Sequence, residues 1–416
     1  MAHLTQVEQS IPFPREEYED RWRRVYEAIE ERGEFSTLVV WQRSGGSYDR
    51  AGDVLWLSNY ASQASGQEMY YEGFDMGRAH AALIFHEGKD PELHIAEPLS
   101  VTDQELIVAG EIHAHRFLPE EVGKRLVELG VEGPVGFAGD DTIPALYHRH
   151  LVAAAKGLEF VAVDPLILSL QRVKSDREVE IFRRGGTIAS QALSATMEAL
   201  IAGEAESVAA ARGATKVIEA GGGFQRIAIN HGSKSENVQW RDGLYGYDTT
   251  APQPGEMVRA WVYGPILHGY WLDPGRSAVC GNEPTDQQRQ LLETAVAVTQ
   301  GLIAACTTDV SPREAGKLGD KLIADSGLNK EHAGGEMWQL YGHSVGSYFM
   351  LPMIPAQYPD DMVAPVDIDS KFKPNEVMTV EFFLNEPGVG TATFEELFLI
   401  TETGPEMLTD TPLLFW

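Results

Sequence analysis

The feature that most constrains the fold is a change in the pattern of expected elements after Asp164-Pro165. Before this point, helical patterns alternate with short apolar runs, which is typical of an α/β domain. Gly, Asp or polar turn residues bound most of these runs. We expect helices over 15–32, 120–129 and 143–156, and strands over 37–41, 54–57, 81–85 and 135–138.

After Asp164-Pro165 the strands are no longer separated one by one by helices. Thr285, three residues before Gln288, and Ser311-Pro312 each mark the start of a helix. Strands that come in groups between pairs of helices indicate an α+β domain. The expected helices cover 176–200, 205–220, 285–306 and a segment from 311, and the expected strands cover 224–229, 257–263, 269–279, 376–384 and 391–400. We therefore place one domain at 1–166 and a second at 167–416.

Length and charge narrow the possible functions. A chain of 416 residues is too long for one compact core, which agrees with two domains. Its formal net charge of −29 would repel nucleic acid and anionic membrane surfaces, so neither is an expected partner. Cys280 and Cys306 are too few for a disulfide framework. No signal peptide or membrane-spanning run is visible, so we expect a cytoplasmic protein.

Four residues of the second half have the chemistry of metal ligands. Asp273 follows a bulky strand-like run, and His343 lies between glycines that permit close backbone approach. Glu381 and Glu395 each interrupt an apolar strand, where a carboxylate is costly to bury without a partner. Three carboxylates and an imidazole suit a divalent ion. Taken singly, each also fits an edge charge or a loop residue.

The order and spacing of these residues resemble the M24 family, which includes creatinase, prolidase and methionine aminopeptidase. Gly264, Gly269, Tyr270, Asp273, Arg276 and Ser277 match one motif; His343 and Gly346 match the next; and Glu381 and Glu395 match the last two. The resemblance implies an α+β pita-bread catalytic domain preceded by a smaller α/β domain of the creatinase type. It also implies Asp273, His343, Glu381 and Glu395 as metal ligands, and a homodimer.

Two departures from the family pattern bear on function. An aspartate that binds only the second metal falls on Val262, so we expect one ion, of Mn, Fe, Zn or Co. A second histidine of the peptidases falls on Met350, whose thioether cannot transfer a proton. We therefore expect weak cleavage of ordinary peptides and a place near the creatinase, ectoine hydrolase and dimethylsulfoniopropionate lyase branches.

Further residues are candidates for catalysis or substrate binding. His231 and His268 are candidate general acid–base groups, and Tyr341 is a third catalytic candidate. Trp240, Trp261, Tyr263 and Met350 are candidates for lining the substrate pocket. Aromatic residues around a pocket would favour a cationic substrate, although core packing explains most aromatic residues.

We expect hydrolysis of a C–N bond in a small polar or cationic substrate that is not a peptide, through water activated by the metal. Three alternatives remain open: a C–S lyase acting on dimethylsulfoniopropionate-like substrates, an enzyme like the Xaa-Pro peptidases, and a binding protein that has lost catalysis. The lyase branch resembled here carries an Asp-x-Asp pair where this chain has Trp261 and Tyr263.

Overall fold

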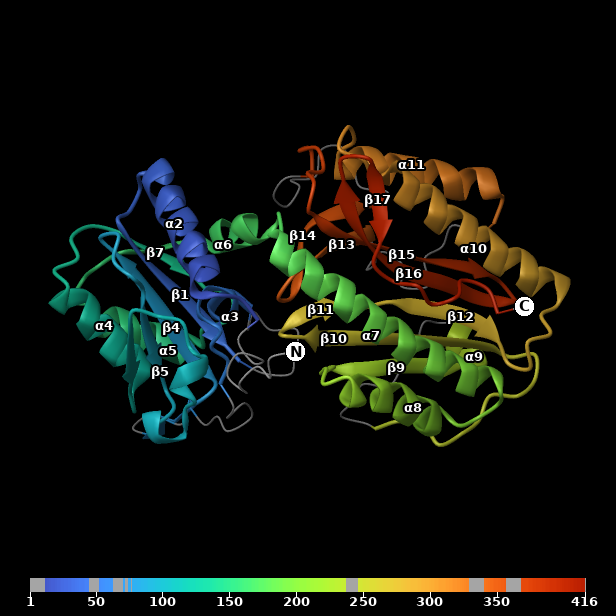
Figure 1. The fold of residues 1–416 in the computed structure, drawn as a ribbon, viewed down its shortest axis with the longest axis horizontal. Helices are drawn as coiled ribbons and strands as arrows, with labels where there is room; N and C mark the ends of the chain where they lie inside the picture. Colours follow the sequence, from blue (N-terminus) through green and yellow to red (C-terminus); the bar gives the residue numbers. More distant parts are fainter. Residues whose placement is uncertain are drawn as a thin grey trace, which may run out of the picture. The chain divides into compact units, whose positions relative to one another are not determined.

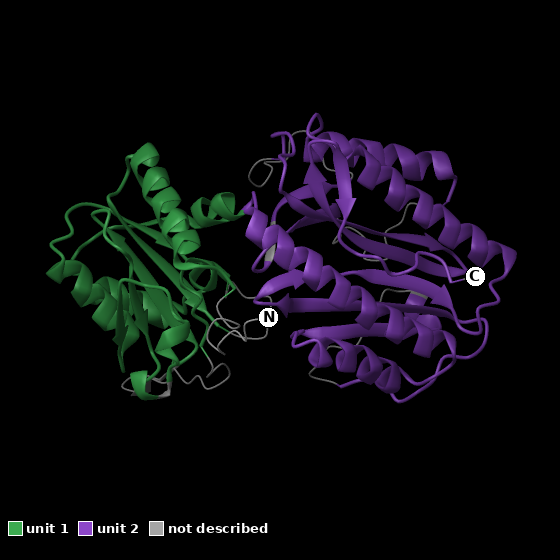
Figure 2. Ribbon diagram, viewed as in Figure 1, with its two compact units in different colours: residues 1–171 green, residues 172–416 purple. Residues whose placement is uncertain are grey.

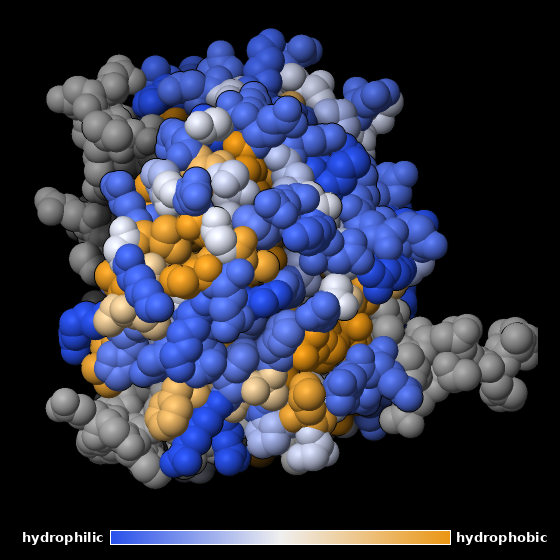
Figure 3. Space-filling view, turned by 90° about the vertical axis from the view of Figure 1, so that its left-hand side faces the viewer, coloured by the Kyte–Doolittle hydropathy of each residue, from blue (hydrophilic) through white to orange (hydrophobic). Residues whose placement is uncertain are grey.

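The chain divides into two compact units, residues 1–171 and 172–416 (Figure 2). The computed structural model describes residues 12–44, 52–62, 70–71, 74–75, 77–236, 246–328, 340–356 and 368–415. Hydrophilic residues cover most of the face seen in Figure 3, with smaller hydrophobic areas between them. None of the described helices is long and apolar enough to cross a membrane.

Unit 1 is an α/β domain built on a six-stranded mixed sheet with the order β6-β5-β4-β1-β7-β8 (Figure 1). Val39 and Trp41 of β1 pack with residues of α4 and α5 in one hydrophobic cluster. Helix α3 contacts β1 and also packs against α2. The elements are α2 (Arg15–Arg32), β1 (Thr37–Arg43), α3 (Gly52–Ser58), β2 (Tyr70–Tyr71), β3 (Phe74–Asp75), β4 (His80–His86), β5 (Glu92–Ile95), β6 (Glu111–Ala114), α4 (Leu118–Glu128), β7 (Val135–Ala138), α5 (Ala145–Ala154), β8 (Phe160–Ala162) and α6 (Asp164–Gln171).

The strand expected over 54–57 is wrong, because this segment lies in helix α3. A short apolar run fits either a strand or a buried helix. Distant side chains decide between them by satisfying the backbone at both helix ends. Gln42 Oε1 accepts the backbone N–H groups of Val54 and Leu55 at 3.1 and 3.2 Å. Trp22 Nε1 donates to the carbonyl of Leu57 at 2.7 Å.

The boundary between the units also differs from the expected one at 166/167. Helix α6, Asp164–Gln171, belongs to unit 1, where it packs against β7 and α2. Its residues Leu166, Ile167 and Leu168 are buried. Asp164-Pro165 therefore starts the last helix of unit 1.

Unit 2 is an α+β domain with a nine-stranded sheet that follows the path β11-β10-β12-β16-β15-β13-β14, with β9 beside β10 and β17 beside β16. Capping boxes at Ser175, Thr285 and Ser311 start its helices α7, α10 and α11. The elements are α7 (Asp176–Ile201), α8 (Glu206–Glu219), β9 (Arg226–His231), α9 (Ser233–Glu236), β10 (Met257–Leu267), β11 (Tyr270–Leu272), β12 (Gly275–Val279), α10 (Asp286–Ala305), α11 (Pro312–Ser326), β13 (Leu340–Val345), β14 (Phe349–Pro355), β15 (Val377–Glu386), β16 (Gly390–Thr401) and β17 (Gly404–Met407).

The long helices of unit 2 cover one face of this sheet (Figure 1). Val380 and Phe382 of β15 share a hydrophobic cluster with Leu291 and Leu292 of α10. Ile227 of β9 lies under α8, because a Cβ added to Gly213 would meet its Cδ1 at 2.8 Å. Successive strand residues point to opposite faces, so the residues between these apolar ones point to the other face.

Candidate metal centre

A row of residues across four neighbouring strands defines the face opposite the helices. Trp261 of β10 pairs with Gly275 of β12, Gly275 pairs with Glu395 of β16, and Glu395 pairs with Glu381 of β15. Directly paired residues share a face of a sheet. Both glutamates therefore point to the same side, beside the indole of Trp261.

His343 and Asp273 complete the cluster from two other segments. His343 lies in β13, and Asp273 lies between β11 and β12. The Nε2 atom of His343 is 3.4 Å from Asp273 Oδ2, 3.6 Å from Glu381 Oε1 and 3.7 Å from Glu395 Oε1. All four side chains are buried. Candidate ligands from distant parts of the chain thus surround one point.

The carboxylates of this cluster fit a cation. Asp273 Oδ1, Glu381 Oε1 and Glu395 Oε1 are buried and make no hydrogen bond to the described residues. Burial raises the pKa of Glu381 to about 7, against the opposing effect of His343. Burial, then the charges of Asp273 and Glu381, raise the pKa of Glu395 well above its ordinary value. A divalent ion would remove this mutual repulsion, and these oxygen and nitrogen donors suit Mn, Fe, Co or Zn.

The surroundings of His343 orient its ring for coordination. Its Nδ1 lies 3.0 Å from the carbonyl oxygen of Ser344, a group that can only accept a hydrogen bond. The ring proton therefore belongs on Nδ1, which leaves the lone pair of Nε2 directed at the carboxylates. The backbone N–H of His343 donates to Thr379 Oγ1 at 3.2 Å, which ties β13 to the strand of Glu381.

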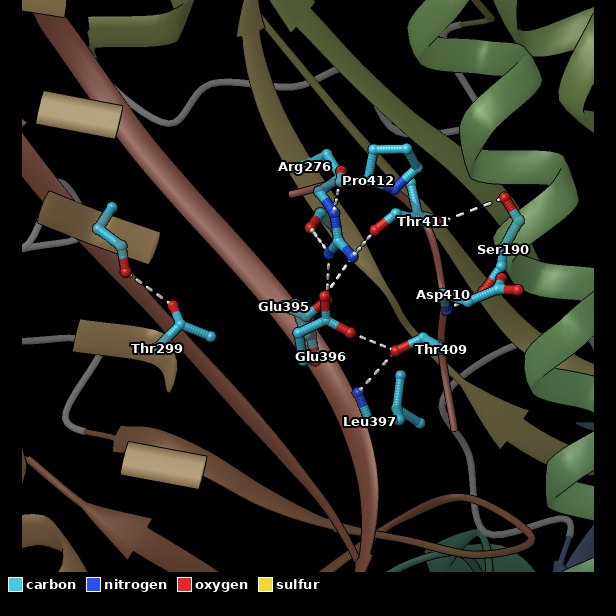
Figure 4. A network of polar contacts seen from close by, with 12 residues as sticks. Ser190, Arg276, Thr299, Glu395, Glu396, Leu397, Thr409, Asp410, Thr411 and Pro412 are labelled. Atoms are coloured by element: carbon cyan, nitrogen blue, oxygen red, sulfur yellow. Dashed lines mark hydrogen bonds and ion pairs between the residues drawn. The ribbon is translucent and has the colours of Figure 1, made fainter. Parts of the chain in front are cut away.

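Glu396, next to Glu395, belongs to a separate network on the other side of the sheet (Figure 4). Its carboxylate pairs with the guanidinium of Arg276 and accepts a hydrogen bond from Thr409 Oγ1. Arg276 also donates to the carbonyl oxygens of Glu395 at 3.0 Å and Thr411 at 2.7 Å. Adjacent strand residues point to opposite faces, so only Glu395 faces the cluster. The network therefore fixes the backbone of Glu395 from the face of the sheet opposite the cluster.

Trp261 and Tyr263 lie on the site face of β10, and each ring is in contact with the guanidinium group of an arginine. The guanidinium carbon of Arg259 is 5.8 Å from the ring centre of Trp261, and that of Arg226 is 4.7 Å from the ring centre of Tyr263. Val262 alternates with these two residues and is fully buried on the helix-covered face, where it pairs with Ile227. Its aliphatic side chain offers no ligand atom.

Arg259 is a functional candidate that sequence analysis missed. It lies two residues before Trp261, so both share a face, and its side chain is completely buried. Its Nε donates to Asn230 Oδ1 at 3.0 Å, whereas Nη1 and Nη2 make no hydrogen bond to the described residues. Burial lowers its pKa to about 9, which still leaves it charged at neutral pH. The signal in the sequence was an arginine inside the apolar run 257–263.

The three histidine and tyrosine candidates for catalysis are not brought to the cluster. His231 pairs with Val258 on the helix-covered face, and its Nδ1 lies 2.7 Å from Glu206 Oε1 of α8. His268 lies in the turn between β10 and β11 at a positive φ of 51°, and burial, then the charge of Arg184 on α7, lower its pKa.

Tyr341 is buried in the hydrophobic cluster beneath α10 and α11, and its hydroxyl donates to Asp320 Oδ1 at 2.7 Å. His231 and Tyr341 are each held by a side chain of a helix, Glu206 of α8 and Asp320 of α11, and sequence patterns could not predict these contacts. Trp240 and the side chain of Met350 lie outside the described residues.

Comparisons with known proteins find a family and relatives for this chain. The model of metallopeptidase family M24 matches residues 180–402. Among curated relatives, an Xaa-Pro dipeptidase of Pyrococcus horikoshii is 24% identical over 309 residues, which cover 71% of this chain and 79% of that protein. One of Pyrococcus furiosus is 25% identical over 306 residues, covering 70% and 76%. These relatives give no support to a place near the non-peptidase branches.

Solved structures show the same fold. The Xaa-Pro dipeptidase from Bacillus anthracis has a TM-score of 0.74 at 18% identity, and the match covers 96% of this chain and 100% of that one. The prolidase from Pyrococcus horikoshii OT3 has a TM-score of 0.72 at 18% identity, covering 94% and 99%. The similarity confirms the expected α+β pita-bread domain preceded by a smaller α/β domain. Since the family model matches more than half of the 416 residues, this protein belongs to metallopeptidase family M24.

Proposed function

We propose that this protein hydrolyses the amide bond of a small substrate with a free carboxylate, and that Xaa-Pro dipeptides are its first candidate substrates. One divalent ion, held by Asp273, His343, Glu381 and Glu395, would support the reaction. The observation that carries the proposal is the convergence of three buried carboxylates on His343 Nε2, each of which has one oxygen that makes no hydrogen bond to the described residues.

The side chains fit the needs of such a hydrolase. An ion in this position supplies a Lewis acid and lowers the pKa of water. The three carboxylates balance its charge, and the hydrogen bond from His343 Nδ1 fixes the tautomer that can coordinate. The proposal of a single ion rests on Val262, which provides no carboxylate for a second one.

Two observations support a substrate with a carboxylate. Both curated relatives are named Xaa-Pro dipeptidase, and such dipeptides end in a free carboxylate. Arg259 presents a buried, charged guanidinium on the site face, and a guanidinium matches a carboxylate in geometry. A cationic substrate is disfavoured, because Arg259 and Arg226 already lie against Trp261 and Tyr263.

The comparisons thus favour the peptidase alternative over the non-peptide substrate expected first. A small amide that is not a peptide remains the second candidate, since Met350 stands where the resemblance implies a histidine. The C–S lyase alternative has weaker support, because Trp261 and Tyr263 supply no carboxylates. The homodimer and the cytoplasmic location remain predictions.

A substrate panel tests the proposal. The metal-loaded protein would be assayed with Xaa-Pro dipeptides, with the same dipeptides amidated at the C-terminus, with small non-peptide amides and with sulfonium acids. We expect cleavage of the free dipeptides, at least ~10-fold slower cleavage of the amidated ones, and no activity in Asp273→Asn. Cleavage of non-peptide amides alone would establish the second candidate. Bound metal without any turnover would contradict hydrolysis and indicate a binding protein.

A further inference from the structure

A second cluster of metal-ligating side chains lies at an edge of the unit 1 sheet. Strands β5 and β6 run parallel, and their register pairs Glu92 with Glu111 and His94 with His113. Residues two apart on a strand share a face, so all four side chains project from the same side of this edge.

The ligand atoms are close enough to meet on one ion. His94 Nε2 lies 3.5 Å from Glu92 Oε2, and His113 Nε2 lies 3.8 Å from the same oxygen. The three atoms lie within 4.8 Å of one another. Two ligand atoms of a tetrahedral zinc ion are ~3.4 Å apart, given zinc bonds of about 2.0–2.2 Å. Small side-chain rotations therefore close the site.

Each of the two histidines His94 and His113 buries one ring nitrogen without a hydrogen bond in the described part of the chain, which is energetically costly. The Nε2 atoms of His94 and His113 are buried and make no hydrogen bond to the described residues. The side chain of His94 is 1% exposed, and that of His113 is 31% exposed. A buried polar atom without a hydrogen bond is uncommon in proteins and calls for an explanation such as an ion. Partial exposure of His113 gives an ion access from solution.

A third histidine orients His94. The Nδ1 of His94 lies 2.9 Å from Nε2 of His115, so one of the two nitrogen atoms donates to the other. When His94 Nδ1 is the donor, its Nε2 carries a lone pair directed at Glu92 and His113. The ring of His94 stacks on those of His113 and His115, with centroids 4.8 and 5.1 Å away. This packing restricts the rotation of the imidazole rings.

Arg125 of α4 holds the carboxylate of Glu92. Its Nε and Nη2 each donate to one Glu92 oxygen, both at 2.8 Å. Each carboxylate oxygen can accept more than one hydrogen bond or ligand contact. The bidentate pair with Arg125 therefore positions Glu92 and leaves lone pairs for an ion. Glu111 Oε2, 3.2 Å from His113 Nε2 and mostly exposed, is available as a further ligand.

We propose that Glu92, His94 and His113 form a second metal site in unit 1, separate from the centre in unit 2, with Glu111 as a fourth ligand. Two imidazoles with carboxylates favour a transition-metal ion such as Zn²⁺ over Mg²⁺ or Ca²⁺. The site does not depend on the proposed hydrolysis, since none of its residues belongs to the catalytic unit.

Metal stoichiometry tests this site independently of activity. The Asp273→Asn background removes the centre in unit 2, and the full chain would be dialysed against Zn²⁺ at neutral pH and its metal content measured. We expect about one bound equivalent in this background and none after adding His113→Ala. His150→Ala is the matched control: this histidine of unit 1 has similar exposure, 34%, lies 2.7 Å from Glu120 Oε1, and its loss should leave binding unchanged.

A second variant guards against indirect effects. His94→Gln removes the buried ligand while keeping a polar side chain, and we expect the same loss of one equivalent. A Zn²⁺-dependent rise in the melting temperature should accompany binding in the background protein and disappear in both variants. The proposal is overturned if the background protein binds no Zn²⁺, or if His113→Ala retains the full equivalent.

Discussion

The carboxylates of Glu395 and Glu396 are neighbours in β16 and serve opposite faces of one sheet. Glu395 lies 3.7 Å from His343 Nε2, whereas Glu396 pairs with the buried guanidinium of Arg276. Arg276 also binds the carbonyl of Glu395 at 3.0 Å. The ion pair on one face therefore fixes the backbone that carries a candidate metal ligand on the other.

Loss of Arg276 should destabilise unit 2 strongly. Arg276→Met leaves Glu396 buried without its partner, and removal of one member of a buried pair costs about 3–5 kcal/mol. Arg183→Met is the matched control, because its pair with Glu406, at 2.8 Å, is 45% and 41% exposed and should contribute less than ~1 kcal/mol. Urea unfolding of each variant measures the difference. Equal effects of the two substitutions on the free energy of unfolding would show that the buried Arg276 pair contributes no more than the exposed one.

A substitution in the metal centre should stabilise the metal-free protein but weaken its binding of metal. Glu381→Gln removes one of three crowded carboxylates, so the metal-free protein should melt at a higher temperature than wild type. The same variant should bind the metal at least ~100-fold more weakly, because even residues that only support ligands contribute 10–100-fold. Calorimetry with and without a chelator checks both signs. Glu386→Gln, on the same strand and outside the cluster, should change neither quantity.

Arg259 should determine preference for a free carboxylate. Arg259→Met should lower kcat/KM for Xaa-Pro dipeptides by about 10- to 100-fold, because a charged hydrogen bond contributes about 1.5–3 kcal/mol. The effect on C-terminally amidated dipeptides should be much smaller. Arg259→Lys keeps the charge without the bidentate geometry and should lie between the two. A uniform loss on both substrate types would instead indicate a structural role for Arg259.

Low pH should destabilise unit 1 through protonation of His80 on unfolding. This side chain is fully buried and accepts a hydrogen bond from Trp41 Nε1 at 2.9 Å. Burial, then the charge of Arg43, lower its pKa to about 3, whereas an unfolded histidine has a pKa of about 6.5. The unfolded state thus binds more protons between these values, and the free energy of unfolding falls as the pH drops from about 6.5 towards 3.

Hydrogen exchange of the β1 and β4 backbone between pH 7 and pH 4.5, corrected for intrinsic rates, measures this effect. His80→Gln retains an acceptor and cannot be protonated in this range, so its protection should change less with pH than that of wild type. If both proteins lose protection equally, another group causes the acid sensitivity.

The sequence by itself determined most elements and the change from α/β to α+β. It also singled out the four side chains that converge in unit 2, although their joint assignment as ligands came from the resemblance to the M24 family. Elements can be predicted because the periodicity of apolar residues is a local property of the sequence. A carboxylate in an apolar strand stands out because burying its charge without a partner costs free energy. The segment 54–57 escaped this reasoning, since Gln42 and Trp22 bind the ends of α3 from elsewhere in the chain.

Only the tertiary structure decided which polar side chains share a site. His231 and Tyr341 are held on the helix-covered side by Glu206 and Asp320, while Arg259 reaches the site face through the register of β10 with β12. The pairing of β5 with β6 likewise brings His94 and His113 together. Strand pairing joins residues far apart in the sequence, and a one-residue shift would turn each side chain to the opposite face.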